Sequence, residues 1–368
     1  MRVSFYLFVI FVWMLEACSD NSGYKFTLRG DLEKVDDGKL YLYEGYVHEG
    51  KLLDSANVIN GKFEFNCTTE YPGRFTLRFA GGSGSISCFL DGKDMLLKGL
   101  FHVQSLKGSP ANDLKWEYAS LIQSRYKGKN QELLNAYGKV AETDWEAENE
   151  LATQIFKLEE VRYEVAKEFV QKYSDNVYAA FVATREADSY ERGKELYELL
   201  TPRIRQTSFG QELKRRTDKL AATALGRFCP DFEVVDADGN KLVLSSLLET
   251  SFKNSIVVID FWASWCGPCR KEMKSLMRQY KELSNKGVHF MSVSLDDSEV
   301  KWKKAYEEEG FPWLNTWDKV EWKKSEVVKA LGISGIPLIL VLDQNGKIVA
   351  RNLRRDMLKD KLIELLKQ

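Results

Sequence analysis

A buried strand that runs directly into two closely spaced cysteines limits what the C-terminal part of this chain can fold into. The run from Ile256 to Ile259 is continuously apolar, which is typical of a parallel strand covered on both faces. The chain then reaches Cys266-Gly267-Pro268-Cys269, and a helical pattern follows to about Ser284. Three-residue spacing at the start of a helix puts both sulfurs on one side, close enough to form a disulfide.

The position of the first cysteine predicts its chemistry. A thiolate at a helix N-terminus is stabilised by unpaired backbone N–H groups and by the positive end of the helix dipole. We therefore predict that Cys266 attacks a substrate disulfide and that Cys269, one turn further in, resolves the mixed disulfide. A zinc site and an inert structural disulfide are the alternatives. The spare zinc ligands are only Cys229 and three scattered histidines, so we predict no metal and no other cofactor.

The C-terminal part reads as a βαβ unit followed by a hairpin and a last helix. Residues 288–295 and 338–342 are predicted strands, and 347–349 is the expected antiparallel partner of the second. Asp356 is the predicted cap of the final helix. The segment 296–329 is expected to be a packed pair of surface helices, with a partner-binding groove as the alternative.

The rest of the chain changes character twice. Alternating apolar residues and the turn signal Asn60-Gly61 predict a sandwich or barrel of small strands. Apolar residues at helical spacing then predict helices, one of which begins at Thr201-Pro202. The predicted divisions are a signal peptide at 1–17, a lipid-anchored tether at 18–24, a β-rich domain at 25–107, a helical segment at 108–222 and an α/β domain at 223–368.

The first residues have the pattern of a targeting segment. Arg2 precedes an apolar run from Val3 to Leu15, which suits a signal-peptide core and is short for a transmembrane helix. Leu15-Glu16-Ala17-Cys18 resembles a bacterial lipobox, in which lipid is attached to the cysteine, although Glu16 departs from the usual residue. Because Ser19 is not aspartate, the resemblance favours the outer membrane, facing the periplasm. An ordinary signal peptide is the alternative.

Four stretches resemble one family. Residues Asp260 to Cys269 are similar to the active-site strand and motif of thioredoxins, and Arg270-Lys271-Glu272-Met273 resembles the TlpA/ResA subgroup of membrane-tethered thiol-disulfide oxidoreductases. Phe228 to Phe232 resembles the opening motif of that subgroup, and Gly335-Ile336-Pro337 resembles its cis-proline loop. The resemblance covers roughly residues 225–368. It implies a thioredoxin-like α/β fold, a mixed sheet flanked by helices.

The resemblance also implies roles for individual residues. Pro337, if cis, packs beside the thiols and leaves backbone groups of Ile336 free to pair with an extended substrate. Asp260 resembles the buried carboxylate that takes the Cys269 proton, and a hydrogen-bonded structural aspartate is the alternative. Glu272 matches an active-site glutamate, or else is a surface residue of the helix. The remaining predicted substrate contacts are Trp265, Gly267 and Pro268.

Two residues depart from the family pattern, and the pairing of two cysteines is undecided. Lys274 stands where a helix-kinking proline is usual, and Leu338 replaces the usual threonine after the cis-proline. Cys67 and Cys88 lie in or near neighbouring predicted strands, so a disulfide between them is one option. Upstream, the stretch from Asp54 to Phe63 resembles a β-rich domain of unknown function that precedes TlpA-like domains in some bacterial lipoproteins.

These observations predict a membrane-tethered thiol-disulfide oxidoreductase that reduces disulfides of exported proteins. Its partners would be those protein thiols and disulfides, an electron donor in the envelope, and the membrane through the lipid on Cys18. A disulfide oxidase or isomerase is the alternative, because the same residues carry electrons in both directions. A second alternative is a binding or scaffold lipoprotein in which the thiol domain is secondary. A peroxidase is a weaker alternative. Lysine plus arginine (53) nearly equals aspartate plus glutamate (54), which argues against a nucleic-acid partner.

Overall fold

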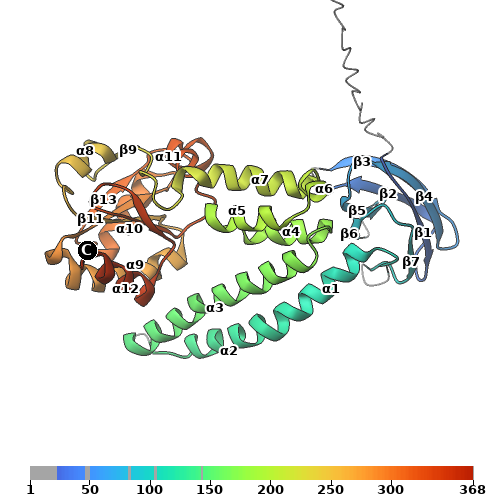
Figure 1. Cartoon of the computed structure of the whole chain (residues 1–368), viewed down its shortest axis with the longest axis horizontal. Helices are drawn as coiled ribbons and strands as arrows, with labels where there is room; N and C mark the ends of the chain where they lie inside the picture. The colour runs from blue at the N-terminus through green and yellow to red at the C-terminus, as the bar shows by residue number, and fades with distance from the viewer. Residues whose placement is uncertain (1–22, 46–49, 82–83, 103–105, 142–143, 368) are drawn as a thin grey trace, which may run out of the picture.

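The computed structural model describes residues 23–45, 50–81, 84–102, 106–141 and 144–367. Along its longest axis the molecule has three parts in a row, a pair of β-sheets, a set of helices and an α/β domain (Figure 1). The predicted signal peptide and Cys18 lie outside the described residues. Within the described ranges, no helix has the length and apolar character needed to cross a membrane.

The N-terminal part consists of two four-stranded sheets that share one apolar core. Its strands are β1 (Tyr24–Leu32), β2 (Gly38–Glu44), β3 (Lys51–Val58), β4 (Lys62–Thr69), β5 (Gly73–Phe79), β6 (Ser85–Leu90), β7 (Met95–Gly99) and β8 (Leu106–Lys107). The sheet orders are β4-β1-β7-β8 and β3-β2-β5-β6. Phe26 of the first sheet meets Phe75 of the second, with ring centroids 6.1 Å apart. The all-β prediction for this part is confirmed.

The predicted Asn60-Gly61 turn carries the chain from one sheet to the other. Both residues have positive φ, 51° and 75°, which is the backbone that this dipeptide favours. The turn joins β3 to β4, and the amide N–H of Leu32 donates to the carbonyl of Gly61 at 2.8 Å. A Cβ atom on residue 61 would overlap the carbonyl oxygen of Leu32, so the close approach of the backbone requires glycine.

The middle part is helical, as predicted. Its elements are α1 (Pro110–Ile122), the π-helix η2 (Gln123–Lys127), α2 (Gly128–Tyr137), α3 (Trp145–Lys172), α4 (Val177–Glu186), α5 (Tyr190–Leu199), α6 (Pro202–Arg205), α7 (Ser208–Leu220) and the 3₁₀ turn η3 (Ala221–Thr223). Thr201 caps α6 with Pro202 in its first turn, in agreement with the sequence pattern. Helices α2 and α3 form a hairpin whose tip lies beside the α/β domain (Figure 1).

The C-terminal part is a seven-stranded mixed sheet with helices on both faces. Its elements are β9 (Glu233–Val235), β10 (Lys241–Val243), α8 (Leu244–Glu249), β11 (Ile256–Trp262), α9 (Gly267–Leu283), η4 (Ser284–Lys286), β12 (Val288–Ser294), α10 (Glu299–Glu309), β13 (Leu314–Trp317), η5 (Trp322–Lys324), α11 (Glu326–Ala330), β14 (Leu338–Leu342), β15 (Ile348–Arg351) and α12 (Arg355–Leu365). The strand order is β10-β9-β13-β12-β11-β14-β15. Strands β11, β12 and β13 run parallel, and β14 runs antiparallel to β11. The thioredoxin-like prediction is confirmed.

Strand β11 is buried along its whole length and separates two apolar cores. Val258 and Trp262 face the core that contains the two motif cysteines and the inner residues of α9, α10 and α12. Val257 and Ile259 face the other core, which α8 and α11 cover. The strand therefore delivers the chain to Cys266 on the face of the sheet where α9 and α12 pack.

Three local predictions need correction. The segment 296–329 is not a pair of surface helices, because it contains the strand β13 between α10 and α11. Asp356 does not cap the last helix, which begins one residue earlier and has Arg354 at its N-cap. Cys67 and Cys88 are free thiols on strands of different sheets, so the optional disulfide between them is absent.

Candidate functional site

The two motif cysteines are joined at the N-terminus of α9. The S–S distance is 2.00 Å, and the Cys266 sulfur accepts the backbone N–H of Cys269 at 3.2 Å, so that Cys266 serves as the N-cap. Both residues are buried, with exposed fractions of 5% and 1%. The first sulfur thus lies against the unpaired N–H groups at the start of the helix, where a thiolate would be stabilised. The second lies one turn inside.

The residues around the disulfide form an exposed rim. Trp265 is 62% exposed, and Gly267 and Pro268 are also exposed. The sequence predicted these three residues as substrate contacts, and they do lie on the surface beside a buried bond. A partner protein would therefore meet this rim before its sulfur reaches the cysteines.

The loop that ends at Pro337 lies on the same side. The Ile336–Pro337 peptide bond is cis, as the resemblance implied. Ile336 packs against the core that includes both cysteines. Ile336 lies outside the helices and strands, and its N–H and C=O groups make no backbone hydrogen bond with another described residue. Its polar backbone groups thus remain available to an extended segment of another chain.

Asp260 is a buried carboxyl group in the middle of β11. Its exposed fraction is 2%, and its Oδ2 atom has no hydrogen-bond partner among the described residues. The pKa of Asp260 is raised to about 8, mainly by burial; the positive charge of Arg354 opposes the rise, and the negative charge of Glu272 adds to it. A carboxyl group with this pKa can hold or release a proton near neutral pH.

Glu272 is buried as well, so the surface alternative for this residue is wrong. Its exposed fraction is 3%, and Arg355, equally buried, is its partner. The Nε atom of Arg355 lies 3.3 Å from Glu272 Oε2, and the backbone N–H of Arg355 donates to Oε1 at 3.3 Å. The Nε contact has the distance of an ion pair but not the angle of a hydrogen bond, because Nε has no hydrogen-bond partner among the described residues.

Arg354, which the sequence analysis did not single out, connects the carboxyl groups with the proline loop. The residue is 8% exposed, and its guanidinium group donates to the carbonyl oxygen of Pro337. Burial lowers the pKa of Arg354 below its usual value, and the charges of Glu272 and Asp260 oppose that change. No local pattern around residue 354 pointed to this position, because it depends on how α12 packs.

Asp296 is a second residue that sequence reasoning missed. It is fully buried and accepts the backbone N–H of Ser264 at 2.8 Å and the Ser264 hydroxyl at 2.6 Å. The Ser294 hydroxyl donates to the same carboxylate at 2.7 Å. These bonds hold the segment just before Cys266 against the end of β12. The sequence did contain a signal for Asp296. This aspartate follows closely after the buried parallel strand β12, so it lies at the same edge of the sheet as the Cys-Gly-Pro-Cys motif.

The other described cysteines are poor nucleophiles. Burial raises the pKa of Cys67 to about 11, with Asp54 adding to the shift, and raises the pKa of Cys88 to about 12. Burial likewise raises the pKa of Cys229 to about 12. All three are protonated at neutral pH, which makes them unreactive compared with a helix-capping thiol. The described residues contain no group of three or more His, Cys, Asp or Glu side chains that could hold a metal.

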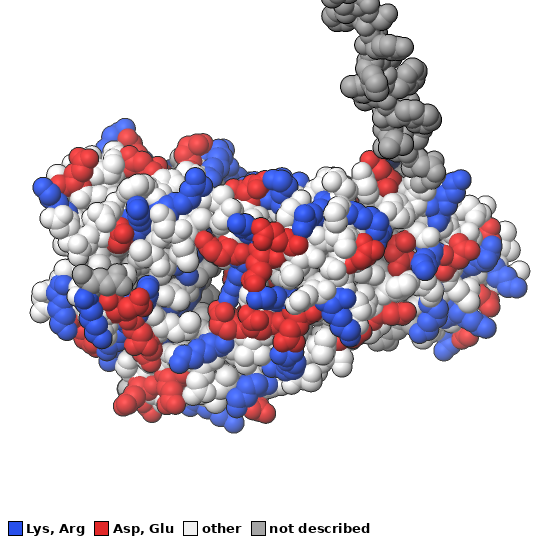
Figure 2. Space-filling view, viewed as in Figure 1, with Lys and Arg blue, Asp and Glu red and all other residues white. Residues whose placement is uncertain are grey.

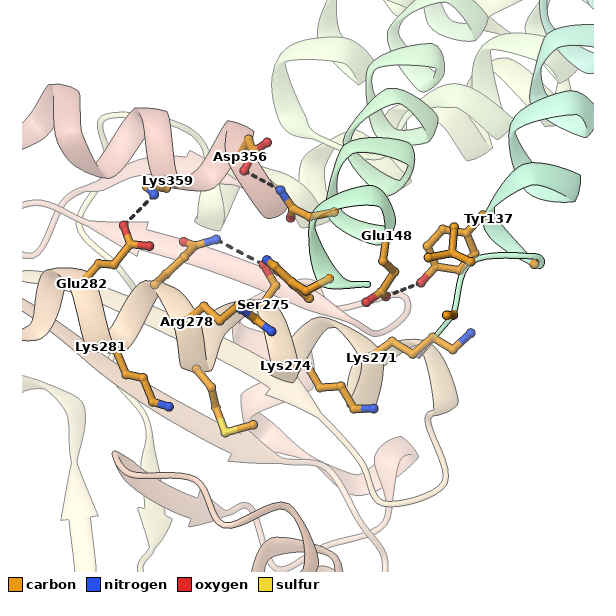
Figure 3. A pocket seen from close by; sticks show the side chains of 17 residues that line it. Tyr137, Glu148, Lys271, Lys274, Ser275, Arg278, Lys281, Glu282, Asp356 and Lys359 are labelled. Carbon is orange, nitrogen blue, oxygen red and sulfur yellow. Dashed lines mark hydrogen bonds and ion pairs between the residues drawn. The ribbon is translucent and has the colours of Figure 1, made fainter. Parts of the chain in front are cut away.

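A cleft of about 1010 Å³ lies where the hairpin of α2 and α3 meets α9 and α12. Four cations of α9 line one wall (Figure 3), and they are Lys271, Lys274, Arg278 and Lys281. Across from them the Tyr137 hydroxyl donates to Glu148 at 2.7 Å. On the face drawn in Figure 2, acidic and basic side chains are interleaved rather than gathered into a field of one sign. The cleft runs beside α9, and neither Cys266 nor Cys269 lines it.

The chain is similar to several thiol-disulfide oxidoreductases and related proteins. The thioredoxin domain of a thiol-disulfide oxidoreductase from Bacteroides vulgatus is 34% identical, covers 39% of this chain and is itself covered to 98%, with a TM-score of 0.35. ResA, a thiol-disulfide oxidoreductase of Bacillus thuringiensis, is 28% identical over 144 residues, which are 39% of this chain and 78% of that protein. Mouse nucleoredoxin is 35% identical over 117 residues, which are 31% of this chain and 26% of that protein.

Two family models match the chain. Residues 26–114 match DUF4369, a domain of unknown function, and residues 225–351 match the AhpC/TSA family. The second match contains the sheet, the disulfide at the start of α9 and the cis-proline loop. The C-terminal part of this chain is therefore a thioredoxin-like thiol-disulfide oxidoreductase domain that is similar to ResA, and a DUF4369 domain precedes it.

Proposed function

We propose that this chain is a membrane-tethered oxidoreductase that reduces disulfides in exported proteins. The observation that carries the proposal is the Cys266–Cys269 disulfide that caps α9, beside an exposed rim and a free loop backbone. This is the oxidised form that a reductase reaches at the end of one turnover. The Gly267-Pro268 pair between the cysteines, together with Ile336 before the proline, supports a reducing role, as in reducing thioredoxins.

The proposed reaction moves two electrons to the substrate. With both cysteines reduced, the Cys266 thiolate attacks one sulfur of a substrate disulfide, and the other substrate sulfur leaves as a thiolate. Cys269 then attacks the Cys266 sulfur of the mixed disulfide, and the second substrate sulfur leaves. Asp260 takes the proton that Cys269 loses. The substrate becomes a dithiol, the enzyme becomes the disulfide, and a dithiol donor of the envelope restores it.

The redox potential decides the direction of electron flow. We expect a potential near that of thioredoxin, about −270 mV, when the full chain without its leader is equilibrated with glutathione buffers. We also expect it to accelerate insulin reduction by dithiothreitol. A potential near about −120 mV, typical of a strong oxidant, would contradict the reductase proposal and favour the oxidase or isomerase alternative.

The tether rests on the sequence alone. We expect the wild-type chain in the membrane fraction of the bacterial envelope and a Cys18→Ser variant in the soluble fraction, because the variant lacks the sulfur that would carry the lipid. Mass spectrometry of the mature N-terminus provides the direct measurement. If the wild type is soluble as well, the segment is an ordinary signal peptide and the tether proposal is wrong.

A further inference from the structure

Three consecutive residues at the start of α12 all contact α3 of the helical segment. The guanidinium carbon of Arg354 lies 5.3 Å from the centroid of the Phe156 ring. The guanidinium carbon of Arg355 lies 5.2 Å from the Trp145 ring, and its Nη2 atom lies 3.5 Å from Glu148 Oε1. The carboxylate of the third residue, Asp356, accepts the side-chain amide of Asn149 at 2.8 Å (Figure 3). The helical segment is therefore fastened to α12 through one short stretch of chain.

The two arginines of this stretch also reach the redox site. Arg354 donates to the Pro337 carbonyl, and its charge interacts with those of Asp260 and Glu272. Arg355 pairs with Glu272 on α9, and the carbonyl of Arg355 accepts the side-chain amide of Gln279 at 2.9 Å. Each guanidinium group thus contacts both an aromatic ring of α3 and an element of the redox site.

The backbone at Arg355 shows how strongly its position is determined. Its φ angle is +53°, in the left-handed region that non-glycine residues rarely adopt. Such a residue persists only where its surroundings dictate the conformation. The backbone N–H of Arg355 donates to Glu272, and its carbonyl accepts Gln279, both on α9. Trp145 and Glu148 of α3 contact its guanidinium group. The helical segment thus supplies two of these four partners.

We propose that α3 completes the redox site, by holding Arg354 and Arg355 as positioning residues for the Pro337 loop and for the carboxyl groups of Asp260 and Glu272. The helical segment then acts on thiol-disulfide exchange without touching a sulfur atom. Phe156 and Trp145 cover the guanidinium groups and exclude water from them, which strengthens their effect on the buried carboxyl groups. This inference rests on the proposed function, because it assigns Asp260 and the proline loop their parts in that reaction.

The test uses the full chain without its leader. It changes the contact between Phe156 and Arg354 first on the α3 side and then on the α12 side. Phe156→Leu removes the ring and keeps an apolar side chain, while Arg354→Met removes the charge that faces Asp260. Phe228→Leu is the matched control, since Lys347 lies over that ring at the same 5.3 Å within the same domain, away from the cysteines. Each variant is assayed for insulin reduction and for the alkylation rate of Cys266 against pH in the reduced protein.

We expect Phe156→Leu to lower kcat/KM about three- to ten-fold, mainly through KM, in line with the loss of a partly buried cation–π contact. Arg354→Met should move the alkylation profile of Cys266 upward by about half a pH unit or more, because the cation facing Asp260 and Glu272 is lost. Arg354→Lys should restore the profile but not KM, because lysine keeps the charge and lacks the planar fork that holds the Pro337 carbonyl. Phe228→Leu should match the wild type in both assays.

Two outcomes would overturn the inference. In the first, Phe156→Leu and Arg354→Met match Phe228→Leu in both assays. In the second, they lower the melting temperature while KM and the pH profile stay at wild-type values, which is what a merely structural role produces. If the wild type does not reduce insulin, the proposed function fails instead, and the alkylation profiles still decide whether Arg354 acts on the site.

Discussion

Cys269→Ser should convert this enzyme into a trap that holds its substrates on Cys266. The first attack needs only the helix-capping sulfur, so the mixed disulfide still forms. The second step needs the buried sulfur one turn further in, and serine cannot supply it. We expect insulin reduction to fall by about three orders of magnitude or more, as when one member of a catalytic unit is removed. Non-reducing electrophoresis and mass spectrometry of envelope extracts then identify the captured proteins.

The matched controls are two other cysteine variants. Cys229→Ser changes a thiol of the same domain that is protonated at neutral pH, and it should keep full activity and capture nothing. The double variant of Cys266 and Cys269 should capture nothing and reduce nothing. Turnover by Cys269→Ser would contradict the two-cysteine mechanism. Peroxide consumption that survives loss of Cys269 would favour a peroxidase.

Asp260→Asn should slow the enzyme and stabilise it, and both effects should grow with pH. With a pKa of about 8, the wild-type carboxyl group is mostly protonated below pH 7 and accepts a proton only as the pH rises. Above pH 8 we expect the variant to resolve mixed disulfides about 100-fold more slowly, within the range for loss of a general base. Below pH 7 the difference should shrink, because the carboxyl group of the wild type then carries its proton too.

The effect on stability has the opposite sign. Folding raises the pKa of Asp260, so the folded state binds this proton more tightly than the unfolded state does. The stability contributed by that proton is fully present below about pH 4 and is lost as the pH rises toward 8. The loss amounts to up to about 1.4 kcal/mol per pH unit. Asparagine does not ionise, so the free energy of unfolding of Asp260→Asn should exceed that of the wild type increasingly over this interval.

Urea unfolding of the disulfide form at pH 5, 6, 7 and 8 measures the stability difference, and stopped-flow decay of a preformed mixed disulfide measures the resolution step. Asp236→Asn provides a control, because that carboxyl group lies on the same domain in an exposed turn, where hydrogen bonds lower its pKa. A stability difference that does not change with pH would show that Asp260 is not protonated in the folded state.

The features of the fold that are determined by residues close together in the sequence could be predicted. Strand β11 is continuously apolar, the Cys-Gly-Pro-Cys motif begins α9, and Pro337 precedes the apolar strand β14. Each of these features depends on residues a few positions apart. Strand β13 escaped prediction because Asn315 and Thr316 interrupt its apolar residues. The partners of these polar side chains come from distant segments, since Asn315 Oδ1 accepts the indole N–H of Trp302 at 2.9 Å and the Thr316 hydroxyl donates to the carbonyl of Ser292 at 2.9 Å.

The rest of the site depends on packing between distant segments. Glu272 has the spacing of either a surface or a buried helix residue, and its buried position became clear only with Arg355 opposite it. Arg354 reaches Pro337 because α12 packs on the same face of the sheet as α9, which no periodicity encodes. The contacts of both arginines with α3 join residues about two hundred positions apart, beyond the reach of any local pattern.

The arrangement of the three parts in a row has a spatial consequence for the enzyme (Figure 1). The chain enters at the sandwich, while the disulfide lies in the domain at the opposite end of the long axis, beyond the helices. Helix α3 alone has 28 residues, or about 42 Å of length at 1.5 Å per residue. An anchor at Cys18 would therefore make the helical segment a spacer that holds the reactive sulfurs well above the lipid surface. Substrates and the electron donor would have to meet the enzyme at that height.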